Sequence, residues 1–365
     1  MPPAAVLLLP LAVLVLAAPV PAHTKSPAPR PPDAAAPDPA HRYATRADVR
    51  AFIGEVAEET GIDARTLTRW FADARFQPRI VAAMDRPIVE PPKWYTYAPP
   101  FLTPERIAGG VAFYAANADA LARAELDFGV PPEIVVAIVG VETFYGRNLG
   151  SYRVFDALTT LAFDYPRRAA FFRGELKEFL RLSREQGFAP LERKGSFAGA
   201  MGVPQFMPGS YRRFAVDFDG DGHADLWTST TDVVGSVANF LARHDWQRGE
   251  PVLLPATIDD DARDAVLRKL DGGISERRTL DAWAADGVAP DVLPSALPAD
   301  TVGLLALEAP PVDGVERADY WIACANFFVL TRYNRSRLYA AAVWHLAEAV
   351  RQARAATTTN SAGSR

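Results

Sequence analysis

Glu142 is the residue of the sequence with the clearest capacity for chemistry, because it lies at the end of an almost unbroken apolar run over residues 131–143. The two prolines at 131–132 favour a helix start, and Gly146 favours a helix stop. Glu142 follows Ile138 and Ile134 by four and eight residues, which places it on the apolar stripe of a buried helix. Because desolvation disfavours the carboxylate anion, we expect its pKa to be raised, which suits a general acid near neutral pH.

A second interpretation of Glu142 is structural. Carboxylates near helix ends often form ion pairs, and Arg147 follows five residues later. Residue type and position alone leave both interpretations open, whereas the apolar run before Glu142 favours a functional role.

The loop GSFAGAMGVPQFMPGSY, residues 195–211, combines a polar group with apolar surface. Its glycines permit close backbone approach, and Gln205 lies between Pro204 and the pair Phe206 and Met207. Such a surface suits a sugar, because apolar faces stack on the ring while an amide binds a hydroxyl or acetamido group. The alternative is a glycine-rich loop that packs helices together.

The segment TRYNRSRLY, residues 331–339, places further polar-tipped side chains at a predicted helix start. These are Tyr333, Asn334 and Tyr339, and Ser336 is a candidate N-cap of the helix. The segment gains meaning only in combination with the others.

The segment DFDGDGHADLW has the ligand spacing of an EF-hand-like calcium loop. The candidate ligands are Asp217, Asp219, Asp221, His223 through its backbone carbonyl, and Asp232. Hard oxygen ligands at this spacing favour Ca²⁺ over transition metals. Position 12 is Thr228 rather than a bidentate glutamate, so Asp232 at the sixteenth position would close a longer loop. The alternative is a solvated acidic turn; a bound Ca²⁺ would be structural.

Composition places the chain among ordinary soluble globular proteins. Its 365 residues are 49% hydrophobic and 23% charged, with a net charge of -5 and no dense basic tract, which argues against nucleic-acid binding. Cys324 is the single cysteine, so an intramolecular disulfide is excluded. The sequence contains no Ser-His-Asp pattern, phosphate loop or dinucleotide fingerprint.

The predicted organisation is α+β and mainly α-helical. Residues 1–22 have the pattern of an export signal, with an apolar run over residues 4–18; because basic residues are missing before that run, a retained signal anchor is the alternative. Thr45, Asp63 and Thr103 are candidate helix starts. The predicted parts are a Pro/Ala-rich linker at 23–40, an N-terminal helical lobe at 41–130, a core at 131–250 with the acidic loop at 217–232, a small accessory α/β insertion at 251–318, and C-terminal helices at 319–356 that complete the core.

These motifs together resemble the lytic murein transglycosylase B family, over roughly residues 42–350 and most weakly over 251–318. The matching stretches are GVETFYGRNLGSYRVFDALTTLAFDYPRRAAFF, KGSFAGAMGVPQFMPGSYRRFAVDFDGDGHADLW, DVVGSVANFLARHDW and NFFVLTRYNRSRLYAAAVW. The resemblance implies a lysozyme-like, mainly helical core with an extra helical lobe and a smaller β-containing lobe. It also implies cleavage of the β-1,4 bond between N-acetylmuramic acid and N-acetylglucosamine in peptidoglycan without water, leaving 1,6-anhydro-N-acetylmuramic acid ends.

Residue roles follow from the same resemblance. By position, Glu142 matches the family's catalytic acid. The substrate-binding positions that it implies are Ser196, Gln205, Phe206, Met207, Tyr333, Asn334, Tyr339, Arg167, Arg168 and, in a looser match, Tyr97. One acid suffices if the muramic acid contributes its 2-acetamido group at the anomeric carbon and its own C6 hydroxyl as the nucleophile, whose high effective concentration outcompetes water.

Two other functions remain open at the level of sequence. A hydrolytic muramidase would need a second carboxylate to activate water, for which Asp156 and Asp164 are candidates. A non-catalytic peptidoglycan-binding protein would need none. We expect no cofactor for catalysis, a structural Ca²⁺, a periplasmic monomer without an acylated cysteine beside its signal, peptidoglycan glycan strands as substrate, cell-wall synthesis proteins as candidate partners, and no nucleic acid.

Overall fold

The computed structural model describes residues 42–86, 91–292 and 301–362. The predicted export signal and linker lie outside the described residues. The chain forms two compact units. Unit 1 comprises the chain up to Arg86 with Tyr152–Arg193 and Phe197–Gly199, and unit 2 comprises Pro87–Ser151, Lys194–Ser196 and Ala200–Arg365. The predicted helical lobe at 41–130 and the predicted core at 131–250 are therefore both divided between the two units.

Unit 1 is helical. Its elements are a 3₁₀ turn at Tyr43–Thr45, α1 (Ala47–Thr60), α2 (Ala64–Asp73), α3 (Pro78–Met84), the short strand β1 (Tyr152–Arg153), α8 (Val154–Asp164), a 3₁₀ turn at Pro166–Arg168, and α9 (Ala169–Glu185). Asp63 caps α2, as predicted, by accepting a hydrogen bond from the Thr66 amide. The predicted cap Thr45 is wrong, because Thr45 belongs to the 3₁₀ turn and Arg46 is the N-cap residue of α1. Phe52, Phe71 and Phe163 form an edge-to-face cluster with centroids 5.5–6.2 Å apart in the core of the unit.

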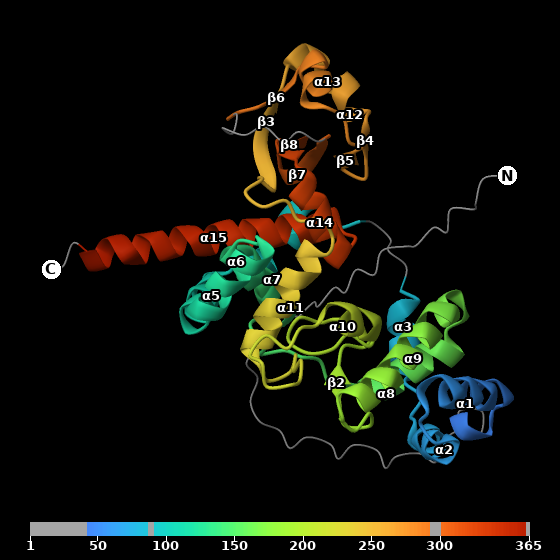
Figure 1. The fold of residues 1–365 in the computed structure, drawn as a ribbon. Helices are drawn as coiled ribbons and strands as arrows, with labels where there is room; N and C mark the ends of the chain where they lie inside the picture. The colour runs from blue at the N-terminus through green and yellow to red at the C-terminus, as the bar shows by residue number, and fades with distance from the viewer. Residues whose placement is uncertain (1–41, 87–90, 293–300, 363–365) are drawn as a thin grey trace, which may run out of the picture. The chain divides into compact units, whose positions relative to one another are not determined.

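Unit 2 carries the remaining helices (Figure 1), of which those outside the predicted insertion come first. They are α4 (Trp94–Tyr97), a 3₁₀ turn at Pro99–Phe101, α5 (Pro104–Ala116), α6 (Ala118–Phe128), α7 (Pro132–Thr143), α10 (Pro208–Phe214), α11 (Thr230–Ala242), α14 (Ala325–Tyr333) and α15 (Arg337–Ala362), with the short strand β2 (Lys194–Gly195). The apolar helix α7 packs against α5, α6, α11 and α15. Because neighbours cover it on several sides, every residue from Pro132 to Gly140 is buried, as the absence of a polar face predicts.

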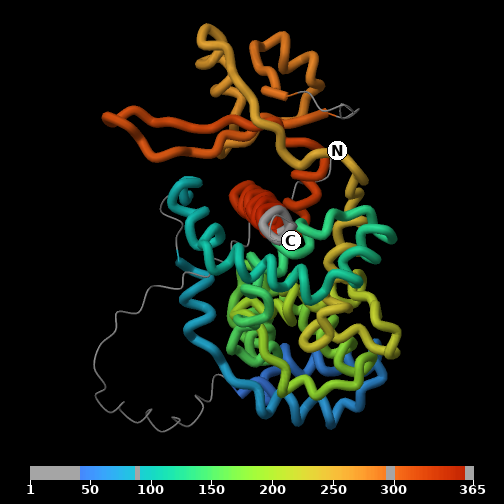
Figure 2. The backbone as a smooth tube through the Cα atoms, turned by 90° about the vertical axis from the view of Figure 1, so that its left-hand side faces the viewer, coloured from blue at the N-terminus to red at the C-terminus, as the bar shows by residue number. Residues whose placement is uncertain are grey.

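The predicted α/β insertion is a six-stranded antiparallel sheet with two short helices, α12 (Arg263–Leu267) and α13 (Leu280–Ala285). The strands are β3 (Leu253–Ile258), β4 (Leu270–Asp271), β5 (Ile274–Ser275), β6 (Val288–Pro290), β7 (Gly303–Val312) and β8 (Val315–Ala323), in the order β4-β5-β7-β8-β3-β6. Strand β8 extends five residues past the predicted boundary at 318. Figure 2 shows β7 and β8 as a long orange-red hairpin, whose strand β7 packs against α4.

None of the described helices is both long enough and apolar enough to cross a membrane. The apolar run at residues 4–18 lies outside the described residues.

Candidate functional site

Helix α7 delivers Glu142 to the site and ends one residue later. The sequence predicted that the helix would continue to Gly146. It ends earlier, because Phe144 and Tyr145 both adopt left-handed conformations, with φ of 53° and 59°. Two successive non-glycine residues in this region are costly, at about 1–2 kcal/mol each. The turn is held in place by the Thr143 hydroxyl, which donates to the carbonyl of Val203 at 2.9 Å. The end of α7 is therefore tied to the glycine-rich loop.

Glu142 lies where the buried helix begins to open. The residue is partly exposed, unlike the fully buried residues Val135–Val139 before it, so its accessible edge can meet a ligand. The hydroxyl of the buried Tyr339 donates a hydrogen bond of 2.6 Å to Glu142 Oε1. Burial raises the pKa of Glu142 to about 7, and the hydrogen bond from Tyr339 opposes that rise. In the described part of the chain no second carboxylate contributes to the shift.

Two other tyrosines face the Glu142 carboxylate. Burial raises the pKa of Tyr333 and of Tyr97, and the negative charge of Glu142 adds to both shifts. The Tyr333 and Tyr339 rings are nearly parallel, with centroids 6.3 Å apart and planes inclined by 12°. Three phenols from α4, α14 and α15 thus surround one acid. The sequence-predicted residues Tyr97, Tyr333 and Tyr339 are brought together with Glu142.

The glycine-rich loop supports this aromatic wall. The Tyr333 hydroxyl donates to the carbonyl of Pro204 at 2.6 Å, and the Tyr333 ring lies 5.8 Å from that of Phe206. Phe206 is 2% exposed, so it forms the base under Tyr333. Gln205 adopts a φ of 53°, and its amide nitrogen donates to the carbonyls of Gly202 and Leu149. These bonds orient the Gln205 side chain and leave its oxygen as the group suited to accept from a sugar hydroxyl.

The other predicted substrate positions of unit 2 have local structural partners. Buried Ser196 accepts a hydrogen bond of 3.0 Å from the Ala200 amide. Half-buried Met207 is the N-cap residue of α10. Asn334 accepts from the Ser336 amide at 3.3 Å, and Ser336 caps α15, as predicted, by accepting from the Tyr339 amide. Asn334 and Ser336 therefore define how α15 begins, and with it the direction in which the Tyr339 side chain points from the helix.

Arg167 and Arg168 belong to unit 1. Exposed Arg167 lies 3.5 Å from a carboxylate oxygen of Asp85, and the Arg168 guanidinium lies over the Phe171 ring at 4.5 Å from its centroid. The Arg167 side chain is exposed at the surface of its unit, whereas Arg168 is half-buried.

Arg106 contributes to the site although the sequence did not single it out. From α5, which Thr103 caps as predicted, its guanidinium donates to the carbonyl of Gly140 and lies 4.4 Å from the centroid of the Phe144 ring. Its own carbonyl accepts a 2.9 Å hydrogen bond from the Tyr145 hydroxyl. Arg106 thereby clamps the last turn of α7. Only its position in the first turn of a predicted helix was readable, because its partner is a backbone carbonyl 34 residues away.

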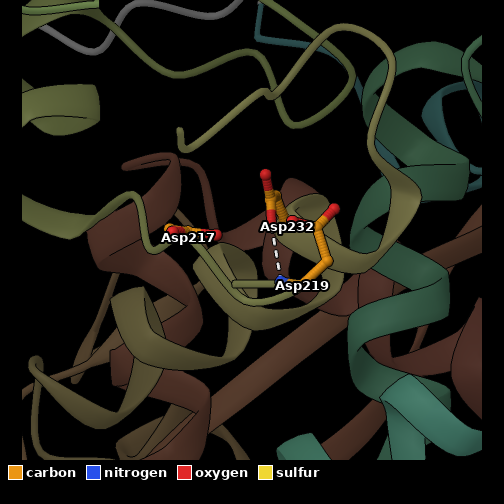
Figure 3. A group of neighbouring side chains, drawn as sticks. All are labelled: Asp217, Asp219 and Asp232. Carbon is orange, nitrogen blue, oxygen red and sulfur yellow. Dashed lines mark hydrogen bonds between the residues drawn. The ribbon is translucent and has the colours of Figure 1, made fainter. Parts of the chain in front are cut away.

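The acidic loop brings three of its predicted ligands together. Side-chain oxygens of Asp217, Asp219 and Asp232 lie within 4.8 Å of one another (Figure 3). Asp232 is buried in the first turn of α11 and accepts from the amides of Phe218, Asp219 and Asp225 at 2.7–3.1 Å. Burial raises the pKa of Asp232, against the effect of these amides, and the charge of Asp219 adds to the rise.

The exposed end of the loop is organised by backbone amides. Although desolvation opposes it, hydrogen bonds from the amides of Gly222, Gly220 and Asp221 lower the pKa of Asp217. The Asp221 side chain is not part of the three-carboxylate group and accepts instead from the His223 amide at 2.9 Å. The set of carboxylates fits a hard cation, since three of them offer oxygens within 4.8 Å of one another and a positive charge among these oxygens would relieve the buried carboxylate of Asp232.

Comparison with known proteins covers nearly the whole described chain. The family described as "Transglycosylase SLT domain" matches residues 44–348. Membrane-bound lytic murein transglycosylase B of Escherichia coli (strain K12) is 39% identical over 322 residues, which cover 86% of this chain and 85% of that protein.

Solved structures agree with this chain in both sequence and fold. Soluble lytic transglycosylase SltB1 from Pseudomonas aeruginosa is 44% identical with a TM-score of 0.76, covering 84% of this chain and 99% of that one. The Escherichia coli lytic transglycosylase Slt35 in complex with calcium is 39% identical with a TM-score of 0.76, covering 86% and 95%. SltB3 from Pseudomonas aeruginosa in complex with NAG-anhNAM-pentapeptide is 32% identical with a TM-score of 0.71, covering 83% and 79%. The predicted fold class, mainly helical α+β with a lysozyme-like core, is confirmed.

Proposed function

Because the chain belongs to the transglycosylase SLT domain family and is a lytic murein transglycosylase, a lyase that acts on peptidoglycan, we propose that Glu142 alone supplies the acid and base of its reaction. The bond cleaved is the β-1,4 bond from N-acetylmuramic acid to N-acetylglucosamine, and the product ends in 1,6-anhydro-N-acetylmuramic acid. The observation that carries the proposal is a carboxyl with a pKa of about 7 that accepts a hydrogen bond from Tyr339.

In the first step Glu142 acts as the acid. Its proton passes to the glycosidic oxygen as the bond between that oxygen and the anomeric carbon breaks, so the N-acetylglucosamine side leaves with a hydroxyl. The 2-acetamido group of the muramic acid shields or attacks the anomeric carbon and carries the developing charge. A carboxyl with a pKa near 7 keeps a substantial protonated fraction at neutral pH and is still able to give up its proton.

In the second step the same residue acts as the base. Ionised Glu142 takes the proton of the sugar's C6 hydroxyl while O6 bonds to the anomeric carbon. Any bond that the acetamido oxygen has formed to that carbon breaks at the same time, so the acetamido group returns to its neutral form, the anhydro ring closes and the protonated acid is restored. No atom from water enters the product. The hydrogen bond from Tyr339 stabilises the ionised carboxylate between the two steps.

The hydrolytic alternative needs a second carboxylate that is free to activate water. Both candidates belong to unit 1 and already have partners there. Asp156 accepts from the Arg153 guanidinium and from the Arg75 amide, at 2.7 and 3.0 Å. Asp164 accepts from the Tyr43 hydroxyl and the Arg46 guanidinium, both at 2.6 Å. These pairings support a structural role for the two residues.

Substrate binding is assigned to the groups around Glu142. The faces of Tyr97 and Tyr333 suit the apolar faces of sugar rings, and the oxygen of Gln205 suits a hydroxyl or amide hydrogen. Ser196, Met207 and Asn334 contribute from the glycine-rich loop and the α14–α15 turn, with Phe206 as support. Arg167 and Arg168 are proposed to meet acidic groups of the strand.

Muropeptide analysis tests the reaction. Purified sacculi are digested with the wild type, with Glu142→Gln and with Glu105→Gln, a control acid whose side chain is 71% exposed. Anhydro ends that are formed by the wild type and the control, and that fall by about 10²–10⁴-fold in Glu142→Gln, support the proposal. Reducing ends in the products would show that the enzyme hydrolyses the bond, which would overturn the proposal. Sacculi that remain undigested by the wild type would indicate that the protein only binds peptidoglycan.

The acidic loop is proposed to hold one structural Ca²⁺ through Asp217, Asp219 and Asp232. The ion would supply positive charge that ties the loop to the start of α11, and no catalytic step involves it. Calcium at a hundredfold excess over Kd should raise the free energy of unfolding of the wild type by about 2.7 kcal/mol. Asp217→Asn should lose most of this gain and the exposed control Asp281→Asn should keep it; equal gains in both would contradict the site.

Export is the proposed route to the substrate. Peptidoglycan lies outside the cytoplasm, and the apolar run at residues 4–18 has the length of an export signal's core. Fractionation of cells that express the full chain, followed by N-terminal sequencing, should find a periplasmic protein cleaved near His23. An uncleaved protein in the membrane fraction would support the signal anchor instead.

A further inference from the structure

Glu308 of β7 connects the sheet to two helices that carry site residues. Its Oε2 accepts a 2.9 Å hydrogen bond from the backbone amide of Trp94, the first residue of α4. Its Oε1 accepts from the Arg337 guanidinium, and Arg337 is the first residue of α15. One carboxylate therefore fixes the starting point of both helices.

Arg337 is itself held by the sheet at several points. Its Nη1 donates to the carbonyl of Ala306 at 3.0 Å and its Nε donates to the carbonyl of Gly272. A Cβ at Gly273 would lie 2.5 Å from the guanidinium carbon, so the turn between β4 and β5 closes directly over the charged group. The Arg337 and Glu308 side chains are only 15% and 25% exposed, which distinguishes this pair from a solvated surface bridge.

Both helices lead from this pair to Glu142 within a few residues. Tyr339, which donates to Glu142, follows Arg337 by two positions, and Tyr97 follows Trp94 by three. The titratable groups that face Glu142 are Tyr97 from α4, Tyr333 from α14 and Tyr339 from α15. Neither Glu308 nor Arg337 contributes directly to the pKa of Glu142, so any influence on it passes through the tyrosines.

We propose that Glu308 and Arg337 are positioning residues, through which the accessory sheet holds Tyr339 and Tyr97 against the catalytic carboxyl. This inference rests on the proposed role of Glu142. The β-containing lobe then has a task in the reaction: it fixes the two aromatic groups whose placement decides how Glu142 gives up and regains its proton. A shift of about 1 Å in such groups can cost about 10²-fold in rate.

The same hairpin offers a matched control. Glu316 of β8 pairs with Lys93, the neighbour of Trp94, at 2.9 Å, but the Glu316 side chain is 67% exposed. This second bridge joins the hairpin to the same segment without touching α15. Neutralising Glu316 removes a more exposed ion pair of the same hairpin and leaves the Glu308–Arg337 connection in place.

The test measures kcat and KM against pH on defined glycan strands for the full-length wild type, Glu308→Gln, Arg337→Lys, Glu316→Gln and Tyr339→Phe. Glu308→Gln should lower kcat by about 10–100-fold and move the alkaline limb of the profile to higher pH, in the direction of Tyr339→Phe. The direction follows because a loosened hydrogen bond from Tyr339 stabilises the Glu142 anion less. Arg337→Lys keeps the positive charge but loses the several donors of the guanidinium, so its alkaline limb should also move to higher pH. Glu316→Gln should match the wild type.

The double variant Glu308→Gln/Tyr339→Phe identifies the route. Because the Tyr339 hydroxyl is already absent, the added Glu308→Gln change should produce no further shift of the limb. A folded Glu308→Gln enzyme with a wild-type profile, or shifts that add in the double variant, would overturn the inference. If circular dichroism shows that Glu308→Gln is unfolded, Arg337→Lys provides the same test. If Glu142→Gln remained active in parallel, the proposed function would fail, whereas an inactive Glu142→Gln beside an unchanged Glu308→Gln would remove only this inference.

Discussion

Removing the hydroxyl of Tyr339 should move the pH dependence of the enzyme upward. In the structure this hydroxyl donates to Glu142 Oε1 at 2.6 Å, within an environment whose burial already raises the pKa of the carboxyl to about 7. A hydrogen bond to a charged group contributes about 1.5–3 kcal/mol, and one pKa unit corresponds to about 1.4 kcal/mol. If most of that energy favours the ionised form, Tyr339→Phe should raise the pKa of Glu142 by about 1–2 units.

The sign of the shift has a kinetic consequence. The alkaline limb of kcat/KM reports loss of the proton from the acid in the free enzyme, so it should move from near pH 7 toward about pH 8–9. At the same time kcat at neutral pH should fall, because the carboxylate formed after the first step is stabilised less and the proton is transferred less readily from the more weakly acidic group.

Two measurements check this prediction. Release of anhydro-muropeptides from sacculi is followed between pH 4.5 and 9.5 for the wild type and Tyr339→Phe, and the Glu142 carboxyl carbon is titrated by NMR in both proteins. Circular dichroism confirms that the variant is folded. An alkaline limb that stays in place or moves to lower pH, in a folded variant, would refute the assigned role of the hydrogen bond.

Three other perturbations have defined outcomes. Glu142→Gln should be more stable than the wild type above pH 7, by up to about 3 kcal/mol. The pKa of Glu142 is about 7 in the folded protein against an ordinary 4.5, so the stability of the wild type falls as the pH rises from about 4.5 to 7. Thermal unfolding at pH 4 and pH 8 measures the difference in stability between the two proteins, and an equal difference at both pH values would contradict the raised pKa. Chelation of calcium should lower the Tm of the wild type but not of Asp217→Asn, and scanning calorimetry with and without a chelator should show it. Gly140→Ala should cost about 1–3 kcal/mol and reduce activity, since its Cβ would lie 2.6 Å from the Tyr145 hydroxyl, whereas Gly174→Ala in open space should be neutral or stabilising; urea unfolding compares the two, and equal effects would argue against a tight α7 turn.

Local sequence carried much of the information about the elements of the site. The apolar run before Glu142 predicted a buried helix, because burial on all sides requires that neither face be polar. The aspartate spacing at 217–232 predicted a loop whose carboxylates converge, and Ser336 was correctly identified as a cap, since both depend on residues close together in the chain. The end of α7 was the local exception: Phe144 turns the chain before Gly146 does, against its own backbone preference.

Only the tertiary structure decided what these elements do together. The donor to Glu142 is Tyr339, 197 positions away, and the clamp on the last turn of α7 is Arg106 acting through a backbone carbonyl. Arg337, the first residue of α15, donates to Glu308, which belongs to strand β7 of the accessory sheet. A sequence pattern reports the environment of one segment, whereas the pKa of a carboxyl depends on which groups distant segments place around it and on how much water they exclude. The sequence determined that an acid would lie on an apolar helix; burial in the folded chain and the hydrogen bond from Tyr339 decided that the pKa of this acid lies at about 7.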